Sequence, residues 1–176
     1  IPLHHGSHDY QVKGAVNLTG NNLRWWPQVP ALDNVQGQIN FTQAGFNFNN
    51  IKVKALGGES LVSAHMEDAQ AGKPTKIEIT SDGNLTAQGL QNYAPAAAKP
   101  LAAKLSGMTN YSAVINTVGH QLYLKIDSDL QGLASSLPQP LEKTAQATFP
   151  LSIHSFAQGN NEQMRISLGN VIYANY

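Results

Sequence analysis

NVQGQINFTQAGFNFNNIKVK, residues 34–54, alternates apolar and polar side chains over most of its length. Val35, Ile39 and Phe41 share one parity, and polar residues fill most of the positions between them. Successive side chains of a β-strand point to opposite faces of a sheet, so this pattern predicts strands with one apolar and one polar face. Ala44-Gly45 interrupts the alternation with residues suited to a turn. The stretch therefore predicts antiparallel strands joined by a hairpin.

The same alternation recurs along the chain and predicts roughly ten short strands in an antiparallel meander. Turn residues such as Gly57-Gly58 and Ser81-Asp82-Gly83-Asn84 stand between the apolar runs, which favours hairpin connections. The apolar positions are expected to line one continuous face of a mostly β protein. They are Val12, Val16, Leu18, Val35, Ile39, Phe41, Phe46, Phe48, Ile51, Val53, Val62, Met66, Ile77, Ile79, Leu122, Leu124, Ile126, Leu151, Ile153, Ile166 and Leu168.

Two stretches break the period of two. Residues 87–105 are rich in alanine and predict two short helices, of which the second starts near Pro100, because proline suits a first helical turn. Residues 129–143 predict a shorter helical turn that ends in Pro138-Gln139-Pro140. Both breaks follow a strand and both contain Gln-Gly-Leu, so each is predicted to be a helical crossing.

The breaks also suggest how the chain is organised. We expect one domain over residues 9–176, with two weak repeats of a strand set and a crossing at about 9–107 and 108–176. Residues 1–8 contain His4-His5-Gly6-Ser7-His8, which is typical of a flexible arm or of a remnant of an expression tag.

Composition excludes several classes of function. Only 12% of the 176 residues are charged, and 11 basic residues balance 11 acidic ones. A nucleic-acid-binding protein needs a concentrated basic surface, which this sequence lacks, so no nucleic acid is expected as a partner. The chain has no cysteine and therefore neither disulfides nor thiolate metal ligands. No apolar run approaches the roughly 20 residues that a membrane-spanning helix requires.

Asp127 and Asp129 are the pair of carboxylates best spaced for acid–base chemistry, since residues two apart in a strand share a face. A solvated strand residue followed by a helix N-cap explains both more simply. No Gly-x-Ser-x-Gly sequence or other triad context is present. We therefore predict no enzyme, no catalytic residue and no cofactor.

Histidine and tryptophan are the other candidates for a site. His4, His5 and His8 cluster without cysteine or acidic neighbours, and His65, His120 and His154 are scattered, so no metal site is expected. Trp25-Trp26-Pro27 is open to two interpretations: indoles that line a lipid or sugar site, or side chains that pack under a loop.

SDLQGLASSLPQPLEK, residues 128–143, resembles a signature of the YhdP-type members of the AsmA-like family of bacterial envelope proteins. The resemblance continues through LRWWPQVPALDNVQGQINF (23–41), ALGG (55–58), AQGL (87–90) and LSGMTNY (105–111), in the order expected of that family. It covers most of the chain, and it implies an elongated, curved antiparallel sheet that forms an open apolar groove of the β-taco kind.

The resemblance also implies a place and a role. It implies a periplasmic protein, anchored to the inner membrane by a helix outside this segment, that promotes phospholipid transport between the inner and outer membranes. Its implied partners are phospholipid acyl chains and, through parts outside this segment, the bacterial inner and outer membranes.

Two functions remain open from the residues themselves. In the first, the sheet curls into a trough whose apolar face shelters acyl chains, with a gain of about 0.8 kcal/mol for each buried CH₂ group. In the second, two sheets pack face to face as a β-sandwich, a structural or adhesive module of an envelope protein. The alternation fits both, and the resemblance favours the groove.

Overall fold

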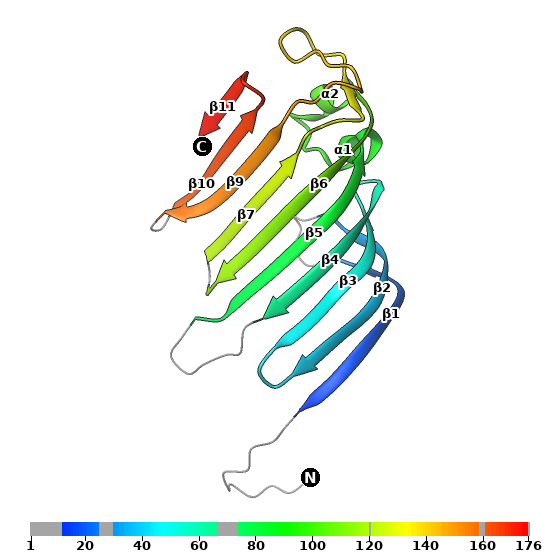
Figure 1. Cartoon of the computed structure of the whole chain (residues 1–176), viewed down its shortest axis with the longest axis vertical. Helices are drawn as coiled ribbons and strands as arrows, with labels where there is room; N and C mark the ends of the chain where they lie inside the picture. Colours follow the sequence, from blue (N-terminus) through cyan, green and yellow to red (C-terminus); the bar gives the residue numbers. More distant parts are fainter. Residues whose placement is uncertain (1–11, 25–29, 67–73, 120, 159–160, 176) are drawn as a thin grey trace, which may run out of the picture.

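The structure, a computed structural model, describes residues 12–24, 30–66, 74–119, 121–158 and 161–175. These residues form an 11-stranded antiparallel sheet with two short helices at one end (Figure 1). The strands are β1 (Lys13–Leu23), β2 (Leu32–Thr42), β3 (Phe46–Ala55), β4 (Gly58–Met66), β5 (Lys76–Thr86), β6 (Leu105–Val118), β7 (Gln121–Ser128), β8 (Leu133–Ser135), β9 (Leu151–Gln158), β10 (Asn161–Leu168) and β11 (Ile172–Asn175). The helices are α1 (Ala87–Tyr93) and α2 (Lys99–Ala102).

The strands follow one another across the sheet. Each strand from β1 to β7 pairs with the next, β7 then pairs with β9, and β10 and β11 complete the order, while β8 pairs with β6 outside this path. The predicted antiparallel meander is confirmed. Within the described residues the apolar face has no second sheet packed on it, which contradicts the β-sandwich alternative.

The strands are longer than the sequence pattern indicated. β6 has 14 residues, and β5 runs straight through Ser81-Asp82-Gly83-Asn84, which we predicted to be a turn. The reason is that β5 and β6 pair without a register shift from Lys76 and Val118 to Thr86 and Met108. A continuous ladder on a long partner outweighs the turn preference of four polar and small residues.

Curvature is concentrated at the N-terminal end of the sheet. Register shifts occur between β1 and β2, between β2 and β3, and between β3 and β4, whereas pairings from β4 onward are regular. Asn34 and Asn50 have positive φ values of 51° and 52° beside these shifts. Bulges bend the strand that carries them, and asparagine tolerates the left-handed conformation, so these residues account for the bend.

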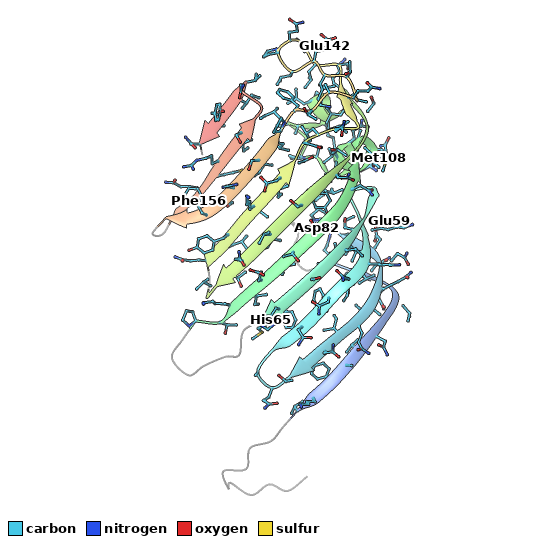
Figure 2. All side chains as sticks on the ribbon, viewed as in Figure 1. Glu59, His65, Asp82, Met108, Glu142 and Phe156 are labelled. Atoms are coloured by element: carbon cyan, nitrogen blue, oxygen red, sulfur yellow. The ribbon has the colours of Figure 1, made fainter. Side chains whose placement is uncertain are left out.

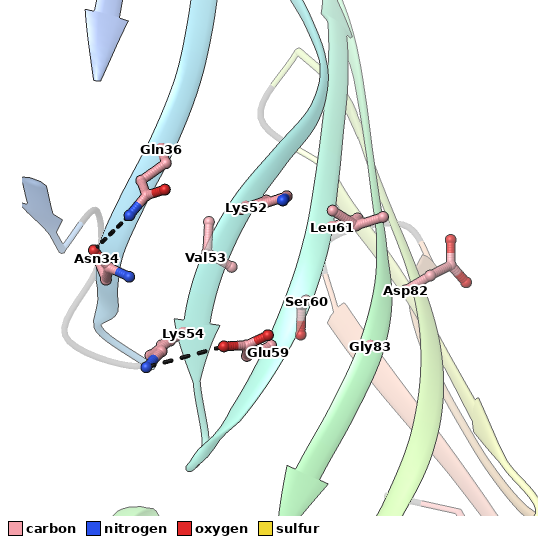
Figure 3. Close-up of a pocket in the computed structure, with 10 residues that line it drawn as sticks. All are labelled: Asn34, Gln36, Lys52, Val53, Lys54, Glu59, Ser60, Leu61, Asp82 and Gly83. Carbon is pink, nitrogen blue, oxygen red and sulfur yellow. Dashed lines mark hydrogen bonds and ion pairs between the residues drawn. The ribbon is translucent and has the colours of Figure 1, made fainter. Parts of the chain in front are cut away.

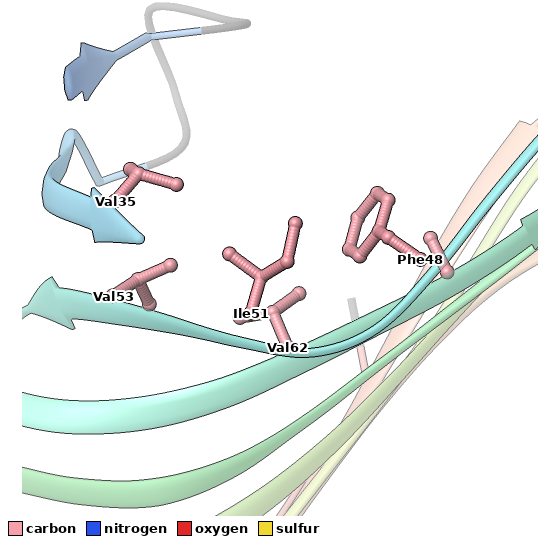
Figure 4. Close-up of a cluster of buried hydrophobic side chains, with 6 residues drawn as sticks. Val35, Phe48, Ile51, Val53 and Val62 are labelled. Atoms are coloured by element: carbon pink, nitrogen blue, oxygen red, sulfur yellow. The ribbon is translucent and has the colours of Figure 1, made fainter. Parts of the chain in front are cut away.

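The buried core lies inside this bend. Val35 on β2 faces Val53 and Ile51 on β3, and Val62 and Phe48 project into the same space (Figure 4). Val35 is 2% exposed and Ile51 is 3% exposed. Leu18, Leu23, Leu32 and Ile39 pack around the cluster from β1 and β2. The first two strands thus cover part of the apolar face of the next two.

The predicted helical crossing at residues 87–105 is present as α1 and α2. The Thr86 side chain accepts a hydrogen bond from Gly89 N at 3.0 Å and so caps α1, and α2 has proline in its first turn. A Cβ on Gly89 would collide with the carbonyl of Leu56 and lie 2.6 Å from Gly57 N. Glycine therefore lets α1 contact the β3–β4 turn, which brings the ALGG and AQGL segments together.

The second predicted crossing is wrong, because residues 129–143 contain no helix. The segment instead forms β8 against β6 and a bridge between Ser135 and Lys143. The ammonium group of Lys143 donates hydrogen bonds to the carbonyls of Leu130 (2.7 Å), Leu133 (2.7 Å) and Thr144 (3.0 Å). One buried lysine therefore holds the segment in a compact, non-helical form. The two Gln-Gly-Leu segments accordingly differ in conformation, one helical and one leading into a strand.

Candidate lipid groove

Strand register places the predicted groove residues that lie in strands on one side of the sheet, here called the apolar face. Ala64, Ile79, Ile115 and Leu124 are successive Cα partners across β4, β5, β6 and β7. A parallel row joins Ile126, Ile153 and Ile166 across β7, β9 and β10. Directly paired side chains point to the same face, so the two rows together extend from β4 to β10.

The predicted residues differ in exposure along the apolar face. Fully buried are Val35, Phe48, Ile51, Val53 and Val62. Packed against these are Leu18, Ile39, Phe46 and Ile79. Half-buried are Met66, Ile77, Leu124, Ile126, Leu151, Ile153, Ile166 and Leu168. More exposed are Val12, Val16, Phe41 and Leu122. Burial is therefore greatest in the cluster on β2, β3 and β4 and lower both around β1 and on the C-terminal strands.

The sequence patterns missed several members of this face. Leu23 and Leu32 pack against the core, and Ile115 continues a row. No strand was predicted over residues 105–118, because Val114 and Val118 place apolar side chains on the otherwise polar parity of β6. The alternation in β5 and β7, which pair with β6, was the feature that could have indicated a strand between them.

The bent end of the groove is closed. A cavity of about 20 Å³ remains between β1–β2 and β3–β4, lined by Leu18, Leu23, Leu32, Val35, Ile39, Phe48, Ile51, Val53 and Val62. One water needs about 10–15 Å³, so this space holds no acyl chain. By contrast, no further layer of the described chain crosses β5 to β10 (Figure 2). The C-terminal strands therefore contribute an accessible part of the apolar face.

The opposite side, here called the polar face, carries the charges. Among strand residues with described side chains, every lysine, arginine, aspartate and glutamate has the polar-face parity. A hollow of about 490 Å³ involves Lys52, Lys54, Glu59 and Asp82, two basic and two acidic residues (Figure 3). Lys54 Nζ lies 3.9 Å from a Glu59 carboxylate oxygen. Balanced charge of this kind gives the hollow no preference for an anion or a cation.

A hydroxyl cluster on the apolar face consists of Ser60, Ser81 and Tyr111. The Tyr111 hydroxyl lies 2.9 Å from Ser60 Oγ and 3.1 Å from Ser81 Oγ. Gly83 is the Cα partner of both Ser60 and Tyr111, so the tyrosine ring crosses over Gly83 to reach β4. A side chain at position 83 would occupy that path, because its Cβ would collide with Ser60 Oγ.

Asp127, Ser152 and His154 form a hydrogen-bonded chain on the polar face. Ser152 Oγ donates to Asp127 Oδ1 at 2.7 Å and lies 3.1 Å from His154 Nε2. The hydrogen bond from Ser152, followed by the neighbouring Lys125 ammonium at 3.0 Å, holds the pKa of Asp127 below its ordinary value, and burial opposes this. A nucleophilic triad needs histidine between serine and carboxylate, whereas serine is central here. Asp129 accepts from Gln131 N at 2.9 Å, in a turn and not at the predicted helix N-cap.

The remaining candidates give no site in the described part of the chain. No group of three or more His, Asp or Glu residues there is arranged to hold a metal ion. His4, His5, His8, His120, Trp25 and Trp26 lie outside the described residues. None of the described helices has the length and apolar character that crossing a membrane requires.

Comparison with protein families gives a match to the YhdP protein family over residues 1–176. Comparisons with curated proteins and with solved structures give no match. The family match covers the whole chain, and the structure has an open, mostly β architecture. The chain therefore belongs to the YhdP family of AsmA-like envelope proteins.

Proposed function

We propose that this chain is a segment of a lipid-transfer protein whose apolar face shelters phospholipid acyl chains during transport between the inner and outer membranes. The observation that carries the proposal is the open half of the apolar face. Ile115, Leu124, Ile126 and Ile153 stand there half-buried, and no described layer of protein covers them. An uncovered apolar surface on an open sheet is typical of a site that binds an apolar partner.

The chemistry of this face fits hydrocarbon. Its described strand side chains carry no charge, so an acyl chain meets no group that must lose its hydration. Burial of six methylene groups contributes roughly 5 kcal/mol at about 0.8 kcal/mol each. The attraction of the rows of Ile, Leu and Ala for acyl chains is non-directional. Lipids can therefore move along the rows, and no catalytic step forms part of this function.

The location is part of the same proposal. Family membership supports an envelope protein, and we propose that the segment lies in the periplasm and is held at the inner membrane by a helix outside it. The groove would then join the two membranes through other parts of the protein. The neutral polar face suits such a place, since balanced charges bind neither membrane surface strongly.

Lipid analysis of the purified protein tests the proposal. We expect phospholipid to co-purify and to be detected by native mass spectrometry and by solvent extraction. Ile115→Asp should reduce the bound lipid, because a carboxylate facing hydrocarbon costs several kcal/mol or must be protonated. Val114→Asp is the matched control, since Val114 is also half-buried but lies on the polar face with Thr80 and Lys125 as its Cα partners.

Circular dichroism must first show the same β content for both variants. Loss of lipid from Ile115→Asp alone supports the groove. Absence of phospholipid from the wild-type protein, or equal lipid in both variants, would contradict it.

A further inference from the structure

The hydroxyl cluster has an unused capacity to donate a hydrogen bond. Ser60, Ser81 and Tyr111 each have one O–H donor and two acceptor lone pairs. The cluster contains two hydrogen bonds, one between Tyr111 and each serine, and each bond uses one donor. One of the three O–H groups is therefore always left over. It belongs to Tyr111 when both serines donate to it, and to a serine otherwise.

The cluster lies where a ligand can reach it. Tyr111 and Ser81 are half-buried, whereas Ser60 is 5% exposed. All three residues have the parity of the apolar face, so Ser81 and Tyr111 present their exposed atoms on the side that bears the apolar rows. Along the face, Ser81 shares its row with Val62, Ala113 and Ile126. An occupant whose hydrocarbon lies on that row therefore meets the hydroxyl cluster at its edge.

The absence of charge around the hydroxyl cluster favours a neutral hydrogen-bond acceptor as its ligand. The apolar face carries no charge among its described strand side chains, so an anionic phosphate bound there would lack a counter-charge. A neutral carbonyl oxygen needs only a neutral donor, which the spare hydroxyl supplies. In a phospholipid such oxygens belong to the two ester groups, which join the acyl chains to the glycerol.

We propose that the hydroxyl cluster binds the ester carbonyls of a phospholipid and so fixes the depth at which the glycerol lies in the groove. This inference rests on the proposed function. Acyl chains lie on the apolar rows, the glycerol esters lie at the hydroxyl cluster, and the phosphate lies beyond the cluster in water.

A competition between ester and ether lipids tests this. The purified protein is incubated with vesicles that contain equal amounts of diacyl and dialkyl phosphatidylglycerol with chains of equal length. It is then re-isolated, and the bound lipids are measured by mass spectrometry. One neutral hydrogen bond corresponds to about two- to tenfold enrichment of the diacyl lipid.

The matched variant removes all three hydroxyls while keeping the shapes, as Ser60→Ala, Ser81→Ala and Tyr111→Phe together. It should bind as much total lipid as the wild type, with a ratio near one. Tyr123→Phe removes a hydroxyl that donates to Gln121 on the polar face at 3.0 Å, and it should keep the preference. If the triple variant does not fold, Ser81→Ala with Tyr111→Phe leaves only the buried Ser60 hydroxyl and should show the same loss.

The outcomes separate the two proposals. Wild-type protein that binds both lipids equally overturns the ester site and leaves the groove intact. A preference that survives removal of the hydroxyls also overturns the ester site. Recovery of neither lipid overturns the groove itself, and the ester site with it.

Discussion

The Tyr111 hydroxyl reaches Ser60 Oγ at 2.9 Å although β5 lies between their strands. Neighbouring strands are about 4.8 Å apart, so the contact between the two side chains spans roughly 10 Å of sheet. Gly83 is the residue of β5 that lies directly between the two partners. The hydrogen bond therefore depends on the absence of a side chain at position 83.

Gly83→Ala should lower the free energy of unfolding by about 1–3 kcal/mol, because overpacking forces neighbouring groups to shift. The new Cβ would collide with Ser60 Oγ and lie 2.5 Å from the Glu59 carbonyl. Urea unfolding followed by circular dichroism measures the change. Asp82→Ala is the control, since Asp82 is exposed on the polar face and its loss should change stability by less than about 0.5 kcal/mol. Equal stability of the two variants would show that Tyr111 does not require the space over Gly83.

Ile51→Ala should destabilise the protein by about 2–5 kcal/mol, since truncation of a buried isoleucine loses apolar contacts and leaves a cavity. Ile51 is 3% exposed and contacts the cluster that closes the bent end of the groove. Leu61→Ala is the matched control on β4, because Leu61 is 44% exposed and lies on the polar face. Thermal unfolding compares the two. A larger loss for Leu61→Ala would mean that the buried side of these strands has been assigned to the wrong face.

Ser152→Ala should raise the pKa of Asp127 toward its ordinary value of 3.8, because the hydrogen bond from Ser152 is the main cause of the lowered pKa. The folded state with a lowered pKa binds fewer protons than the unfolded chain. Asp127 therefore stabilises the fold above about pH 3.8, and this contribution is lost as the pH falls through the lowered pKa. Titration of the Asp127 carboxyl carbon by NMR measures the shift. Ser112→Ala, which removes the Cα partner of Asp127 on β6, should leave the pKa unchanged; a similar rise in both variants would contradict the assigned cause.

Lys143→Met should loosen the segment around β8, because three backbone carbonyls lose a charged donor while the length of the side chain is kept. Loss of such buried hydrogen bonds costs about 1–3 kcal/mol. Amide hydrogen exchange should quicken at Ser135 and Lys143, whose N–H groups bond to each other's carbonyls at 2.8 and 3.0 Å. Lys104→Met, at an exposed position, should leave these amides protected. Unchanged exchange in Lys143→Met would show that another contact holds the segment.

The sequence pattern predicted the sheet because the alternation of side chains within each strand determines which of them share a face. Val35, Ile39 and Phe41 alternate with polar residues, and the pleat of a strand turns that spacing into a face. Hairpin residues such as Ala44-Gly45 then join neighbours, so the order of β1 to β7 follows from the sequence. The same residues could not predict how far the sheet bends, because the bend depends on register shifts beside Asn34 and Asn50.

Long-range contacts account for what the sequence did not reveal. Residues 129–143 looked helical from their spacing, but the hydrogen bonds of Lys143 to Leu130 and Leu133 fix a different conformation. Ser60, Ser81 and Tyr111 meet only because the registers of three strands align them. No local motif marks such a cluster.

The most direct test of the account is photocrosslinking of lipid at Leu124 and at Tyr123. These residues are consecutive on β7 and both half-buried, but Leu124 lies on the apolar face and Tyr123 on the polar face. A photoreactive amino acid is placed at each position in bacteria, and phospholipid attached to the purified protein is measured by mass spectrometry. We predict strong phospholipid labelling at 124 and background labelling at 123. Equal labelling at both positions, or none at 124, would contradict a lipid-bearing groove on the apolar face.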